Sequence, residues 1–143
     1  MNKKQLLIAA VATVLSVSCA NATSTIDGFA NGTSGTFNID PAKINGDVGY
    51  RQYNDFTVGK GDVANLIFKY QNTKDINTFI NLVQNGVNVN GILNTMRDGN
   101  FYNGHAVFIS PNGLTVGASG VLNVGTLSVT TPTTSAYNKL LTD

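Results

Sequence analysis

The sequence predicts an all-β protein, and within that class it favours a parallel β-helix over a β-sandwich. Short apolar segments rich in β-branched residues recur about every seven residues in the C-terminal part, each bounded by turn residues. This pattern is typical of strands and is too closely spaced for alternating strands and helices. The segments are Ala106–Ile109, Leu114–Val116, Val121–Leu122 and Leu127–Val129.

The corners between these segments decide between the two architectures. A sandwich commonly closes its hairpins with Asn-Gly or Asp-Gly and spaces its turns about 8–12 residues apart. Here the corners contain single glycines and an asparagine, with the small residues Ala118 and Ser119. Such corners let one coil bend and stack on the next, so that neighbouring coils bury a shared core.

The N-terminus has the three parts of a secretory signal peptide. Lys3 and Lys4 form the positive region, Leu6–Val17 forms an apolar run, and Ala20 and Ala22 form a small-x-small cleavage site. The run is shorter than the roughly 20 residues that span a bilayer. We therefore predict export by the Sec machinery, with residues 1–22 as signal peptide and residues 23–143 as the exported domain.

Cys19 is the only cysteine of the chain. Lipid attachment at this residue is the alternative to cleavage after Ala22, although Ser16 stands where a lipoprotein site usually has leucine. Cleavage after Ala22 removes the cysteine, and the exported domain then has no disulfide. Its stability must come from apolar burial and hydrogen bonds.

The net charge of the chain excludes one class of partner. It is +1 for the whole sequence, and loss of Lys3 and Lys4 leaves seven Lys/Arg against eight Asp, a net charge of −1. Nucleic-acid binding requires a basic face that displaces counterions. We therefore expect no nucleic-acid partner, and no electrostatic docking on anionic lipid surfaces.

The first part of the exported domain carries weak signals. We expect residues 23–47 to be a loose lead-in that ends at a turn over 45–47, with Phe29, Phe37 and Ile39 as strand anchors. The exported domain is also rich in asparagine. An amide group both donates and accepts hydrogen bonds, so asparagines at equivalent positions can bond along a stack of coils.

The middle of the chain continues the strand pattern. Phe56 and Val58 alternate as in a strand, residues 59–62 form a turn, and residues 63–68 form the next strand. Residues 75–83 fit one face of a helix, but that helix has only two turns and needs tertiary support. We therefore favour a strand there.

The region after this strand alternates valine and asparagine before it turns. Residues 87–93 predict a strand with a turn at Gly91, and residues 94–103 predict an excursion from the coil. Residues 129–143 contain no recognisable terminal cap. An uncapped coil exposes strand edges, so we expect the chain to be the N-terminal fragment of a larger product or a truncated one.

The sharpest turn of the sequence is Ser110-Pro111-Asn112-Gly113. Serine at the first position, proline at the second and glycine at the fourth are the preferred residues of a type I turn.

This turn and its surroundings resemble the secretion domain of two-partner secretion exoproteins, the filamentous-haemagglutinin-like and leukotoxin-like adhesins. In that family an apolar strand leads to Asn-Pro-Asn-Gly, an apolar residue, a small-residue corner and a further strand. Ser110 replaces the first asparagine, and its hydroxyl can cap the turn in the same way. The positions that match are Phe108–Leu114, Gly117–Gly120 and Val124–Leu127, with Phe56, Val58, Gly61, Leu66, Phe68, Asn88, Val89, Gly91 and Ile92 upstream.

The resemblance implies a right-handed, single-stranded parallel β-helix of the pectin-lyase type that is truncated at its C-terminal end. It implies that residues 23–143 are a partial secretion domain, secreted or held at the surface of a Gram-negative type envelope. The expected partner is an outer-membrane barrel transporter with periplasmic recognition domains, and a host-surface glycan or protein is a further candidate. Ser110, Pro111, Asn112 and Gly113 form the expected secretion motif. Asn88, Asn90 and Gly91 are candidates for recognition by the transporter.

The sequence offers no catalytic constellation, so we expect a non-enzyme without metal or cofactor. His105 is the only histidine, and no motif places a nucleophile beside it. The aspartates occur singly at turns rather than in a metal-binding cluster. Two other functions stay open: a self-contained surface adhesin or carbohydrate-binding module, and the passenger start of a one-chain autotransporter.

Overall fold

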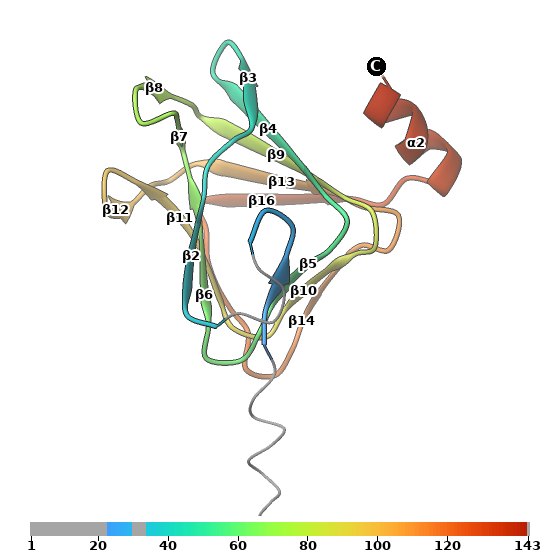
Figure 1. The fold of residues 1–143 in the computed structure, drawn as a ribbon, viewed down its shortest axis with the longest axis horizontal. Coiled ribbons are helices and arrows are strands. Elements are labelled where there is room, and N and C mark those ends of the chain that lie inside the picture. Colours follow the sequence, from blue (N-terminus) through green and yellow to red (C-terminus); the bar gives the residue numbers. More distant parts are fainter. Residues whose placement is uncertain (1–22, 30–33, 143) are drawn as a thin grey trace, which may run out of the picture.

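The computed structural model describes residues 23–29 and 34–142, and the expected signal peptide, with Cys19, Ala20 and Ala22, lies outside them. The chain forms a parallel β-helix whose coils enclose a triangular cross-section (Figure 1). This fold confirms the β-helix prediction and excludes the sandwich. In Figure 1 the chain turns clockwise from β2 through β4 to β5 as it recedes from the viewer, so the helix is right-handed.

Three sheets, here called A, B and C, form the sides of the triangle, and each coil passes through B, C and A in that order. Sheet A contains β1 (Thr25–Ile26), β5 (Phe56–Val58), β10 (Val87–Val89) and β14 (Leu114–Val116). Sheet B contains β2 (Thr36–Ile39), β6 (Val63–Ile67), β11 (Ile92–Arg97), β12 (Asn100–Phe101) and β15 (Val121–Asn123). Sheet C contains β3 (Lys43–Asn45), β4 (Val48–Tyr53), β9 (Thr78–Val83), β13 (His105–Ile109) and β16 (Thr126–Thr130).

The core lies inside the triangle, where alternate side chains of every strand point inward. Phe56 packs edge-to-face against Tyr53 and Phe108, with ring centroids 5.1 and 5.4 Å apart. Phe68 packs in the same way on Phe79 at 5.9 Å. Aromatic pairs in this geometry add to the stabilisation from apolar burial. The Phe56–Phe108 contact therefore joins different coils through the interior, in addition to the backbone hydrogen bonds of the sheets.

An asparagine ladder runs along the outer face of sheet B and confirms that asparagine amides bond along the stack. Each Nδ2 donates to the Oδ1 of the preceding coil, from Asn65 to Asn38 (3.0 Å), Asn94 to Asn65 (2.9 Å) and Asn123 to Asn94 (3.0 Å). The register of the parallel strands places these residues opposite one another. The ladder thus links the three complete coils of the described residues with the partial coil formed by β15 and β16.

The expectation of a loose lead-in over residues 23–47 is wrong. β2 is already the first strand of sheet B, and Phe37 and Ile39 are buried in the core. β1 pairs antiparallel with β5, and β3 pairs antiparallel with β4. These two short strands close the N-terminal end of sheets A and C.

Three hairpins leave the coil at the same corner, between sheets B and C (Figure 1). They are formed by β3 with β4, by β7 (Lys69–Tyr70) with β8 (Lys74–Asp75), and by β11 with β12. The last one is the predicted excursion over residues 94–103, and β9 is the strand that we favoured over a helix. The Lys69 ammonium donates a hydrogen bond to Asp75 and lowers the pKa of that carboxyl.

A helix that the sequence did not predict, α2 (Thr134–Thr142), follows the last strand. The Thr133 hydroxyl accepts a hydrogen bond from the Ala136 amide at 3.1 Å, the usual N-cap contact. Tyr137 is buried although the rest of the helix is mostly exposed. Figure 1 shows α2 beside the triangle, so it does not cover the last coil.

A buried polar pair lies inside the coil, where Asn81 accepts a hydrogen bond from the Tyr53 hydroxyl at 2.7 Å. We expect Tyr53→Phe to lower the free energy of unfolding at pH 7 by about 1–2 kcal/mol, because Asn81 loses a donor in the core. Burial raises the pKa of Tyr53. The wild-type chain therefore loses stability as the pH rises above about 10, the ordinary tyrosine pKa, whereas the variant has no ionisable group at this position.

Urea unfolding at pH 7 and pH 11 measures both effects. The difference in free energy of unfolding between the wild-type chain and Tyr53→Phe should be smaller at pH 11 than at pH 7. Only the wild-type chain must keep a buried phenol neutral at the higher pH. Tyr70→Phe is the control, since this tyrosine is only partly buried. A stability difference that is independent of pH contradicts the prediction.

Candidate recognition surface

The turn at Ser110–Gly113 joins β13 of sheet C to β14 of sheet A. The Gly113 amide donates to the Ser110 carbonyl at 3.1 Å, and the Asn112 amide donates to the Ser110 hydroxyl at 3.4 Å. Gly113 has a φ of 72°, a left-handed conformation that favours glycine. The serine thus caps the turn as the sequence predicts.

Burial separates this motif into a scaffold and an exposed part. Ser110 and Gly113 are buried, Pro111 is half-buried and Asn112 is exposed. The Gly113 carbonyl accepts a hydrogen bond from the Val87 amide of the preceding coil at 2.9 Å. Gly113 therefore helps to hold two coils in register, and only Pro111 and Asn112 of the motif are accessible at the surface.

The second predicted set consists of Asn88, in the middle of β10, and Asn90 and Gly91, in the corner that follows this strand. Asn88 is exposed on the outer face, with its Nδ2 3.5 Å from the Thr57 hydroxyl of the coil before. Asn90 is half-buried, and Gly91 is fully surrounded by the corner of the preceding coil. Of the three residues, Gly91 is a structural corner and Asn88 is the most accessible.

The structure brings the two sets onto one sheet but not into one cluster. β14 begins directly after the Ser110–Gly113 turn and pairs in parallel with β10, which contains Asn88. Thr115 lies opposite Asn88 and is exposed between the two sets. We call Asn88, Asn112 and Thr115 the sheet A strip. It contains no titratable side chain, so it can recognise a partner only through neutral hydrogen bonds.

One edge of the molecule is open. Within residues 34–142, β14, β15 and β16 each pair with a strand of the preceding coil and with no strand beyond. Val116, Val121 and Val129 on these strands are 42%, 45% and 41% exposed. Unpaired backbone groups and exposed valines together make a surface on which a further strand can pair.

Comparisons with known proteins found no match, either to models of protein families, to curated proteins or to solved structures. The assignment of a function therefore depends on the residues and the geometry of this chain.

Nowhere in 23–29 and 34–142 do three His, Cys, Asp or Glu side chains come close enough to share a metal ion. No helix in this part of the chain has the length and hydropathy to cross a membrane. The His105 Nε2 lies 2.7 Å from the Ser128 hydroxyl, a contact between neighbouring strands of sheet C.

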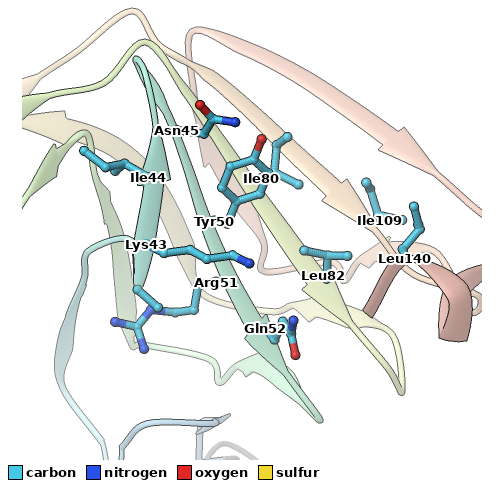
Figure 2. A pocket seen from close by; sticks show the side chains of 11 residues that line it. Lys43, Ile44, Asn45, Tyr50, Arg51, Gln52, Ile80, Leu82, Ile109 and Leu140 are labelled. Carbon is cyan, nitrogen blue, oxygen red and sulfur yellow. The ribbon is translucent and has the colours of Figure 1, made fainter. Parts of the chain in front are cut away.

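The sequence prediction missed a second surface, on the outer face of sheet C. A cleft with a volume of about 870 Å³ lies there between the β3–β4 hairpin and α2 (Figure 2). The signal was present in β9, where Ile80 and Leu82 are apolar although they alternate with the inward-facing Phe79 and Val83. A strand that is apolar on both faces indicates a covered or ligand-binding outer face.

Proposed function

We propose that the chain is the N-terminal secretion domain of a large exported adhesin. In this role an outer-membrane two-partner transporter recognises it, and it nucleates the folding of a β-helix at the cell surface. The main observation that supports the proposal is the difference between the two ends of the β-helix. β1 and β3 close the N-terminal end of two sheets. At the other end β14, β15 and β16 pair only with the preceding coil, and no strand of the described residues lies beyond them.

An open end of this kind supports a nucleating role. The backbone groups of β14, β15 and β16 offer a preformed register for the next coil, so its strands add without a new nucleation step. Non-local strand pairing folds slowly. A chain of this fold can therefore stay unfolded during transport and fold after it emerges.

The sheet A strip supports recognition by a partner. Among the described residues β14 is an edge strand, with Thr115 exposed on the strand and Asn112 exposed in the turn before it. Strand addition to such an edge gives affinity through backbone hydrogen bonds, and the adjoining side chains give specificity. The half-buried Pro111 holds the Asn112 turn in a fixed shape.

An export assay in the organism that encodes the chain tests the proposal. We expect the double variant N88A/N112A to reduce the amount of chain outside the cell at least about fivefold, the effect of about 1 kcal/mol of lost recognition. The chain should accumulate in the periplasm instead. Immunoblots of the medium and of the periplasmic fraction measure both quantities.

The matched control is N100A/N138A, which also removes two exposed amides, on β12 and α2. We expect normal export of this variant. Equal export of both double variants would contradict recognition through the sheet A strip. Normal export after removal of every two-partner transporter gene would contradict the proposed function as a whole.

A further inference from the structure

The cleft on sheet C has an aliphatic floor on the outside of the coil. Parallel pairing brings Tyr50 opposite Ile80, and Leu82 opposite Ile109, on the outward-facing side of β4, β9 and β13. Figure 2 shows these side chains side by side on the sheet, with Leu140 of α2 at one margin. Leu140 is 46% exposed, whereas Leu82 is only 8% exposed, so the accessible part of the floor is formed mainly by Tyr50, Ile80 and Ile109.

The outer faces of the other two sheets differ from this floor. Sheet A carries the polar Thr57, Asn88 and Thr115 at its outward positions. Sheet B carries the asparagine ladder, flanked by the outward-facing apolar residues Val63, Ile92 and Val121. On sheet C the apolar outer side chains form the floor of a cleft, and such a surface marks an interaction site. The volume of the cleft, about 870 Å³, falls within the range of small-molecule sites.

The charged residues at the cleft are both cations. Arg51 is already paired with Asp40 at 3.3 Å. The Lys43 ammonium lies 5.8 Å from the centre of the Tyr50 ring, and no carboxylate of the described residues is within ion-pair distance of it. In Figure 2 its side chain extends across the cleft beside Tyr50. The cleft therefore combines an aliphatic floor with the Lys43 ammonium, which forms no ion pair within residues 23–29 and 34–142.

We propose that this cleft binds an amphiphilic anion, an alkyl chain with a carboxylate head such as a medium- or long-chain fatty acid. The alkyl chain lies on Tyr50, Ile80 and Ile109, where its burial supplies most of the affinity. The carboxylate pairs with the Lys43 ammonium and fixes the orientation. A sugar fits this floor poorly, because an aliphatic surface offers its hydroxyls no hydrogen-bond partners. The site is separate from the sheet A strip and goes beyond the secretion function.

Isothermal titration calorimetry of the purified chain with decanoate tests the proposal. We expect one saturable site. Lys43→Ala should weaken binding about fivefold, the effect of one partly exposed ion pair. Ile80→Asn should weaken it at least about tenfold through loss of apolar contact. Butyrate, which has the head but not the chain, and decyltrimethylammonium, which has the opposite charge, should bind much more weakly than decanoate.

Lys60→Ala is the charge-matched control, since Lys60 is exposed at a corner away from the cleft. It should bind decanoate like the wild-type chain. If Ile80→Asn does not fold, as judged by circular dichroism, the exposed Lys43 still provides the test. The proposal is overturned by the absence of saturable decanoate binding, or by equal affinity of the Lys43 and Lys60 variants. Binding of a neutral apolar peptide in place of decanoate would assign the cleft to a polypeptide and would also overturn it.

Discussion

Replacement of Gly91 by alanine is expected to lower the free energy of unfolding by about 3 kcal/mol or more. A methyl group at this position would overlap the backbone carbonyl oxygens of Gly59 and Asp62 in the coil below. Two hydrogen bonds cross the corner at this point: the Gly91 amide donates to the Val58 carbonyl at 3.1 Å, and the Ile92 amide donates to the Asp62 carbonyl at 2.9 Å. The added methyl group must therefore push two hydrogen-bonded coils apart.

Gly99→Ala is the control for this prediction. Gly99 has a φ of 83° but nothing within 4 Å of the position of a Cβ atom. Gly99→Ala should lower the free energy of unfolding only by the cost of an alanine in the left-handed conformation, about 1 kcal/mol. Urea denaturation of both variants measures the two values. Similar losses for Gly91 and Gly99 would mean that the coils do not approach one another as closely as the structure shows.

Replacement of Phe56 by alanine is expected to destabilise the chain by about 3–5 kcal/mol. Phe56 is fully buried, and its ring connects Tyr53 of the same coil with Phe108 of a later one. Removal of the ring leaves a cavity between coils and breaks two aromatic contacts. Because the domain derives its stability from apolar burial and hydrogen bonds, this loss is a large fraction of the total.

Phe56→Leu keeps most of the buried volume and should cost less than about 1.5 kcal/mol. Val116→Ala is a second control, because this valine is 42% exposed on the edge strand β14. Thermal unfolding followed by circular dichroism gives the order of the variants. A loss for Phe56→Ala no larger than that for Val116→Ala would contradict a core continuous from coil to coil.

The repetitive part of the fold was predictable because its signals are local. Each short strand is apolar at alternate residues, and turns such as Ser110–Gly113 fix the strand ends through their own chemistry. The closing strands β1 and β3 were not predictable, since they are only two and three residues long and exist through pairing with β5 and β4. The right-handed sense of the β-helix was expected only from the family resemblance.

The helix α2 and the cleft escaped prediction for a similar reason. Thr134–Thr142 is too short and too poor in strong helix formers to be stable alone, and it depends on the burial of Tyr137. Thr133 as N-cap and the spacing of Tyr137, Leu140 and Leu141 were the available signals. The cleft unites residues from positions 42 to 140, which only the folded chain brings together.

The candidate recognition site was predicted as a set of residues but not as a surface. The sequence identified Ser110–Gly113 and Asn88–Gly91 as special without separating buried corners from exposed side chains. Gly91 and Ser110 are both fully enclosed, so their prominence in the sequence reflects tight turns. Accessibility is a property of the stacked coils, and a single coil does not reveal it.

The asparagine ladder has a direction. Every asparagine donates its Nδ2 hydrogen toward the N-terminal end of the β-helix. The last acceptor of the ladder is therefore Asn123 Oδ1, and no donor of the described residues bonds to it. Two copies placed face to face by a twofold axis at this end would oppose like partial charges on sheet B. A segment that carries an amide N–H at the matching position would continue the row. The ladder therefore makes the open end selective for a head-to-tail neighbour and discourages symmetric pairing.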